Sequence, residues 1–138
     1  MTGDYEIVDH TADVAIVARG ADVGEAFANA GRVLLSIVTD PDSVAEVEER
    51  RIELSADDLE DLLVAWLNEL IYLFDVENLL LSEFDIGPVG DAGLVATARG
   101  ERVDKTRHRI KLGVKAATHH MLEIDRDSGV RLQVLLDI

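Results

Sequence analysis

The stretch from Leu59 to Phe74 constrains the fold most, because it combines helical spacing with a wide apolar face. Apolar side chains recur there every three or four residues, which predicts an α-helix. They are Leu59, Leu62, Leu63, Trp66, Leu67, Leu70, Ile71 and Phe74. Ser55 followed by Asp58 is typical of a helix start. A helix this apolar must be covered, so we interpret the stripe as core; a partner-binding groove is the alternative.

A second helix is predicted between Asp22 and Asp40, where apolar residues again follow helical spacing. Asp22 and Glu25 resemble a capping box, and Asp40-Pro41 ends the pattern. The remaining apolar and β-branched stretches predict strands. These stretches are 5–9, 14–18, 46–54, 79–86, 94–102, 113–123 and 130–136.

This order, β-β-α-β-α-β-β-β-β, favours an α+β fold. We expect a two-layer sandwich in which both helices pack on one face of a mixed, mainly antiparallel sheet. A chain of 138 residues with 48% hydrophobic content suits one domain that covers residues 1–138.

The composition excludes several kinds of protein. Without cysteine, the chain has no disulfide, thiolate metal site or cysteine nucleophile. No segment is long and apolar enough for a membrane span, so we expect a soluble, cytoplasmic protein. A net charge of −15 repels nucleic-acid phosphates, so tight direct nucleic-acid binding is not expected.

Candidate metal ligands lie near both ends of the chain. His10-Thr11-Ala12-Asp13 connects the first two predicted strands and offers an imidazole and a carboxylate. Carboxylate oxygens suit calcium or magnesium, although one carboxylate alone would not hold either ion. The alternative is a turn in which Thr11 or Asp13 bonds to its own backbone.

At the other end, Asp137 places a side-chain carboxylate beside the terminal carboxylate of Ile138. Two adjacent carboxylates form a ready oxygen pair for a cation. A solvated tail is the alternative, and periodicity does not show that the two ends of the chain meet.

A basic interval contrasts with the acidity elsewhere; its residues are Lys105, Arg107, Arg109, Lys111 and Lys115. It suits a phosphate, a nucleotide or an acidic partner, and a solvated loop is the alternative. Strand alternation places Lys115 and His119 on one face and His120 on the other, so one site would need a bulge to use all three.

Several short motifs, in one collinear order from Tyr5 to Ile138, resemble the archease family. They are Tyr5-Glu6, His10-Thr11-Ala12-Asp13, Glu25-Ala26-Phe27, Asp58-Leu59, Trp66-Leu67-Asn68-Glu69-Leu70, Phe74-Asp75, Lys115-Ala116-Ala117-Thr118-His119-His120 and Asp137-Ile138. The chain departs from the family pattern at His119, where a tyrosine is common, and in its greater acidity.

The resemblance implies an accessory protein rather than an enzyme. Archeases activate the GTP-dependent tRNA-splicing ligase, which joins a 3′-phosphate or 2′,3′-cyclic phosphate end of RNA to a 5′-hydroxyl end. They promote guanylylation of this ligase and its multiple turnover. The resemblance also implies a divalent metal, calcium in the family, at Asp13, Asp137 and Ile138. We expect His10, Lys115 and His120 to face the partner or a nucleotide.

Two other functions are weighed against this one. The first is a chaperone-like protein-protein module that modulates tRNA-modifying enzymes such as a methyltransferase. The second is a metal-dependent hydrolase that uses His10, Asp13 and Asp137. The hydrolase is less favoured because no general acid, base or nucleophile is identifiable beside these ligands, and the familiar enzyme motifs are absent.

Overall fold

The computed structural model describes residues 13–90 and 92–138. Their elements, in chain order, are β1 (Asp13–Gly20), α1 (Val23–Val38), the 3₁₀ turn η1 (Pro41–Ser43), β2 (Glu48–Ser55), α2 (Leu59–Glu77), β3 (Leu79–Ile86), β4 (Gly93–Arg102), β5 (Ala116–Asp125) and β6 (Val130–Asp137). The predicted order is confirmed from the second predicted strand onward. The first predicted strand, 5–9, lies outside the described residues.

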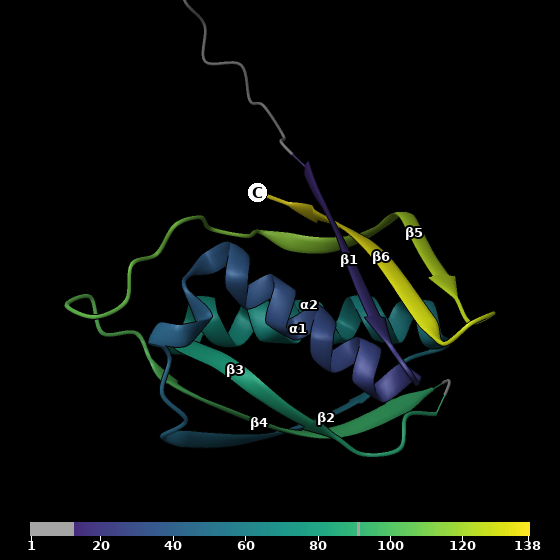
Figure 1. Cartoon of the computed structure of the whole chain (residues 1–138), viewed down its shortest axis with the longest axis horizontal. Coiled ribbons are helices and arrows are strands. Elements are labelled where there is room, and N and C mark those ends of the chain that lie inside the picture. The colour runs from purple at the N-terminus through teal and green to yellow at the C-terminus, as the bar shows by residue number, and fades with distance from the viewer. Residues whose placement is uncertain (1–12, 91) are drawn as a thin grey trace, which may run out of the picture.

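The described strands form two antiparallel sheets, with orders β1-β6-β5 and β2-β4-β3. The predicted α+β class is confirmed, but the strands are divided between two sheets instead of forming one. Figure 1 shows α1 and α2 between the two sheets. Both helices contact both sheets: α1 packs on β1 and β3, and α2 packs on β5 and β3. Each helix is therefore covered on two sides.

The helix starts are set by aspartate caps. Asp22 accepts a hydrogen bond from the backbone N–H of Glu25, and Asp58 accepts one from Asp61, each at 2.8 Å. Both caps satisfy amides that the first helical turn leaves unpaired. Ser55 ends β2, so Asp58 is the residue that caps α2. Among the described residues, no helix combines the length and apolarity that a membrane span requires.

Trp66 lies at the centre of the core and confirms the interpretation of the α2 stripe as core. Its side chain is fully buried, and its indole N–H donates to the carbonyl of Phe27 on α1 at 2.9 Å. Its ring meets Phe84 of β3 edge to face, with centroids 5.5 Å apart. This one residue therefore connects both helices and the β2-β4-β3 sheet.

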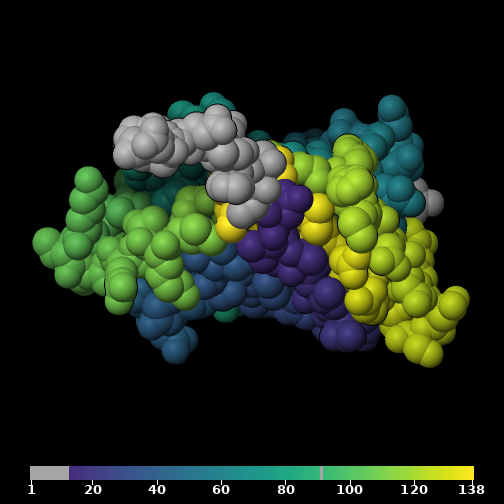
Figure 2. All heavy atoms as spheres, turned by 90° about the horizontal axis from the view of Figure 1, so that it is seen from above, coloured from purple at the N-terminus to yellow at the C-terminus, as the bar shows by residue number. Residues whose placement is uncertain are grey.

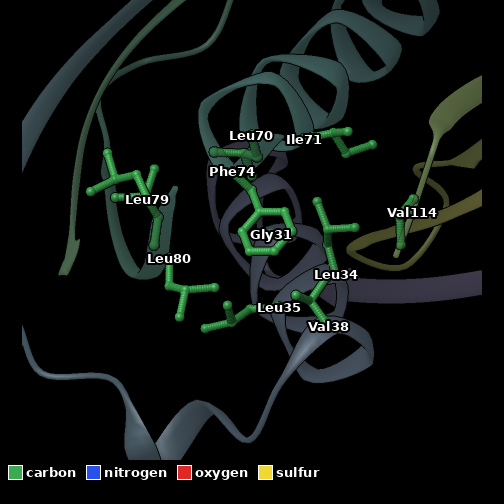
Figure 3. A pocket seen from close by; sticks show the side chains of 11 residues that line it. Gly31, Leu34, Leu35, Val38, Leu70, Ile71, Phe74, Leu79, Leu80 and Val114 are labelled. Atoms are coloured by element: carbon green, nitrogen blue, oxygen red, sulfur yellow. The ribbon is translucent and has the colours of Figure 1, made fainter. Parts of the chain in front are cut away.

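A small apolar cavity remains between α1, α2 and β3 (Figure 3). Its volume is about 30 Å³, and its lining includes Gly31, Leu34, Leu70, Phe74 and Val114. A space of this size holds about one water molecule, and an apolar lining offers that water no hydrogen bonds. It is a packing defect of the core, so functional groups must be sought on the surface.

Candidate functional site

Asp13 and Asp137 are directly opposite each other in the antiparallel β1–β6 ladder. Asp13 is the first residue of β1 and Asp137 is the last residue of β6, so the pairing brings residues from the two ends of the chain together. Directly opposed residues in such a ladder have Cα atoms only about 4.5–5.5 Å apart. The predicted ligands at the two ends therefore share one place on the sheet.

The two carboxyl groups interact with each other. A side-chain hydrogen bond with Asp13 is the main cause that raises the pKa of Asp137, followed by desolvation and by the negative charge of Asp13. The positive charge of Lys115 acts in the opposite direction. Two carboxyl groups this close favour sharing a proton or another positive charge. The pair therefore has the chemistry of a cation site.

Lys115 approaches the pair from the segment that precedes β5. Its backbone N–H donates to the carbonyl oxygen of Asp137 at 2.8 Å, and the next residue, Ala116, is the β5 partner of Asp137. In Figure 2, the yellow C-terminal residues lie between the purple start of β1 and the green segment before β5. A lysine ammonium is thus available beside the carboxylates.

Ile138 extends the oxygen set by one residue. Its side chain is half-buried and packs against the core, which restrains the end of the chain beside Asp137. Within residues 13–90 and 92–138, no three Asp, Glu or His side chains gather in a geometry that would hold a metal ion. Asp13 and Asp137 are therefore two opposed carboxylates, and carboxylate oxygens are the kind of ligand that calcium and magnesium prefer.

The predicted histidines are not all part of this arrangement. His10 lies outside the described residues. His119 bonds through Nε2 to Asp61 of α2 at 2.7 Å, on the surface. His120 is exposed and has no hydrogen-bond partner in the part of the chain that the structure describes. The structure therefore brings Lys115 to the carboxylates and gives neither His119 nor His120 a hydrogen bond to them.

A bulge in β5 explains the exposure of these histidines. The β5–β6 register shifts between Thr118 and Glu123, and Met121 has a φ of 56°. The left-handed backbone at Met121 interrupts the ladder, so the simple alternation of faces fails there. His119, His120 and Met121 are all exposed on this bulge. The bulge that the sequence argument required for a shared site is present, but it directs His119 toward α2.

Asn68 is a positioning residue that periodicity did not identify. Its amide donates to the carbonyl of Ala117 at 3.2 Å and accepts from the backbone N–H of the same residue at 2.8 Å. The side chain thereby occupies the free edge of β5, as a neighbouring strand would. It fixes β5 next to the Asp137 end of β6. The local signal is an amide that lies between the apolar residues Leu67 and Leu70 of α2.

The cations of the basic interval differ in whether they bond to a side chain of the fold. Arg107 forms an ion pair with Glu101, a residue that is only 7% exposed. The ring of His108 is buried; its Nδ1 accepts from the N–H of Asp104, so Nε2 carries the proton toward Glu101. Arg107 is therefore structural. Lys105, Arg109 and Lys111 remain exposed.

Comparisons with known proteins cover nearly the whole chain. Residues 5–138 match the Archease protein family (MTH1598/TM1083). The protein archease of Methanosarcina mazei is 35% identical over 97% of this chain and 95% of its own. The protein archease of Methanothermobacter thermautotrophicus is 39% identical over 97% of this chain and 98% of its own. The solution structure of Methanobacterium thermoautotrophicum protein 1598 is similar with a TM-score of 0.76 and 37% identity, covering 95% of this chain and 96% of that one.

Proposed function

Because the chain belongs to the archease family, which makes it an accessory protein in RNA processing, we propose that it activates the GTP-dependent tRNA-splicing RNA ligase. In this role it promotes guanylylation of the ligase and its repeated turnover, and it catalyses no reaction of its own. The observation that carries the proposal, together with family membership, is the direct opposition of Asp13 and Asp137.

Asp13, Asp137 and the terminal carboxylate of Ile138 would hold a divalent cation, and calcium is the ion that we propose. Oxygen donors in an irregular arrangement suit calcium better than magnesium, which demands near-ideal octahedral geometry. A bound cation at this position would supply positive charge for phosphate oxygens. The negative charge of Asp13 beside Asp137 raises the pKa of Asp137, and a cation between the two carboxylates would relieve this repulsion.

Lys115 is placed to act together with these carboxylates. It is exposed, its backbone is fixed by the carbonyl of Asp137, and its charge already acts on the Asp137 carboxyl. A lysine ammonium provides a mobile point charge that binds phosphate. We therefore assign Lys115 to a nucleotide phosphate or an acidic group of the ligase, and we keep the same assignment for the exposed His120.

A second mechanism of ligase activation would depend on the overall negative charge of the protein instead of on the proposed cation site. An acidic protein of net charge −15 could compete with RNA for a basic cleft of the ligase and so release the product. In that case no single carboxylate would matter, because many others remain. The two routes therefore predict different behaviour of single-site variants.

A multiple-turnover ligation assay with the cognate ligase separates these outcomes. It compares the wild type, Asp137→Ala, a chain that lacks Ile138, and Asp127→Ala as a control in an exposed turn. The cation site predicts loss of activation for the first two variants and none for the control. Equal activity of all four proteins would instead favour the charge-competition route. If the wild type does not stimulate the ligase at all, the proposed function is wrong.

A further inference from the structure

The exposed cations of this acidic protein gather in one short segment. Most of the arginines form ion pairs with carboxylates: Arg32, Arg50, Arg51, Arg99, Arg102 and Arg107. Among the described cations, those that bond to no other side chain are Arg19 on β1 and four residues of the segment 105–115. These four are Lys105, Arg109, Lys111 and Lys115. Lys115 acts on the Asp137 carboxyl, whereas Lys105, Arg109 and Lys111 form no ion pair with any described residue.

Apolar side chains alternate with these cations. Ile110 is 40% exposed and Leu112 is 37% exposed, in the sequence Arg109-Ile110-Lys111-Leu112. A Cβ added at Gly113 would meet nothing within 4 Å, so the surface is open there. Exposed aliphatic side chains between free cations are typical of a surface that another molecule covers.

The backbone of this segment is bonded along one edge only. Residues 108–115 run without a turn or bend. The carbonyl of Arg109 accepts from the Thr39 hydroxyl, and the N–H of Lys111 donates to the carbonyl of Val38, each at 2.7 Å. In an extended chain, the backbone groups of the intervening residues point the opposite way.

The opposite edge is formed by the backbone of Ile110 and Leu112. Neither residue has a backbone hydrogen bond to any residue of 13–90 or 92–138. An extended edge with free N–H and C=O groups pairs readily with another strand. At β5, by contrast, Asn68 occupies the edge beside Ala117. The segment 109–113 is thus an extended edge that the described fold leaves uncovered.

The composition of this edge favours a protein over a nucleic acid as its binding partner. Single-stranded nucleic acids are bound by aromatic stacking, and the segment 105–115 contains no Phe, Trp or Tyr. The net charge of −15 also repels a long polyanion. A protein strand with carboxylates alternating with apolar residues matches the cations, the aliphatic side chains and the free backbone groups together.

We propose that residues 109–113 form a docking edge to which an extended, acidic segment of the partner protein adds as a strand. Carboxylates of that segment pair with Arg109 and Lys111, and its apolar residues pack on Ile110 and Leu112. This assignment rests on the proposed function in taking the RNA ligase as the partner. It adds the place of contact and the chemistry of the partner's segment.

Site-specific crosslinking tests this contact. The photoreactive residue p-benzoylphenylalanine is placed at Ile110, at Leu112 and, as a control of similar exposure, at Val95 on β4, which is 39% exposed. Each variant is irradiated with the cognate ligase, with and without RNA. We expect positions 110 and 112 to crosslink to ligase residues two apart in one Asp- and Glu-rich segment, and position 95 to give no such product. Crosslinks to RNA, or between two copies of this chain, would overturn the proposal.

Charge reversal supplies an independent readout. Arg109→Glu with Lys111→Glu should weaken ligase binding by at least about tenfold, because like charges then face each other. Arg19→Glu with Arg51→Glu changes the net charge equally at exposed positions away from the segment and should have little effect. Circular dichroism verifies that both double variants fold. Equal binding by both, in a complex that the wild type does form, would overturn the docking edge alone. Absence of any wild-type complex would overturn the proposed function as well.

Discussion

Asp137, the last residue of β6, lies directly opposite Asp13, the first residue of β1, at the same end of a three-stranded sheet. The two positions are 124 residues apart in sequence by their numbers, 137 minus 13. Antiparallel pairing makes them neighbours, and a side-chain hydrogen bond with Asp13 raises the pKa of Asp137. This relationship makes the candidate site testable without the ligase.

Calcium should stabilise the protein through this pair. A ligand that binds only the folded state, present at about 100 times its dissociation constant, raises the free energy of unfolding by about 2.7 kcal/mol. Urea unfolding with and without calcium measures this increase in the wild type. The double variant Asp13→Asn, Asp137→Asn should lose it. The control Asp42→Asn, Asp127→Asn removes the same charge from exposed turns and should keep it. An equal calcium effect on both variants would contradict the site.

The Glu101 network should make stability depend on pH in the acid range. A side-chain hydrogen bond from Arg107 is the main cause that lowers the pKa of Glu101 from 4.5 to about 2, followed by the backbone N–H of Ala45. A carboxyl group whose pKa is lower in the folded state than in the unfolded state stabilises the fold at any pH above the unfolded-state pKa. This stabilisation is lost as the pH falls from about 4.5 toward 2.

Glu101→Gln is the variant that tests this dependence. It should lower the urea midpoint at pH 7 and flatten the decline in stability between about pH 4.5 and 2. Glu53→Gln, at an exposed ion pair with Arg51, is the matched control and should leave the acid dependence unchanged. Parallel pH profiles for the wild type and Glu101→Gln would show that this network does not set acid stability.

Trp66 should be the most sensitive position on α2. Trp66→Phe removes the indole donor from the carbonyl of Phe27 and leaves a void, which together should cost about 2–4 kcal/mol in the free energy of unfolding. Tyr72→Phe, on the same helix but 52% exposed, should change it by less than about 0.5 kcal/mol. Urea titration followed by circular dichroism measures both. A similar small effect for both variants would refute the central role of Trp66.

Substitution by alanine should change the stability of the fold in opposite directions at Gly100 and Gly113. A Cβ at Gly100 would collide with the carbonyl oxygen of Leu80 on β3, so Gly100→Ala should destabilise the β3–β4 pairing by about 2–4 kcal/mol. A Cβ at Gly113 meets open space and needs no left-handed backbone, so Gly113→Ala should stabilise the fold by up to about 1 kcal/mol. Thermal unfolding of the pair distinguishes them, and a reversed order would contradict the strand packing described here.

The helices and strands themselves could be predicted, because each depends on local periodicity. The spacing from Leu59 to Phe74 predicts α2, and Asp22 marks the start of α1 as the observed caps confirm. Bulges escape such reasoning, since a register shift depends on the partner strand. The exposure of His120 and the turn of His119 toward Asp61 therefore had no sequence signal.

By itself, the sequence determined which segments form helices and strands, which apolar faces form the core, and which oxygen-bearing residues are candidate ligands. Only the tertiary structure decided that the strands divide into two sheets around the helices, that Asp13 meets Asp137, and that Arg107 and His108 both bond to Glu101. The physical reason is the distance along the sequence over which each interaction acts. Propensity and capping act within a few residues, whereas strand pairing and burial depend on how distant apolar faces cover one another.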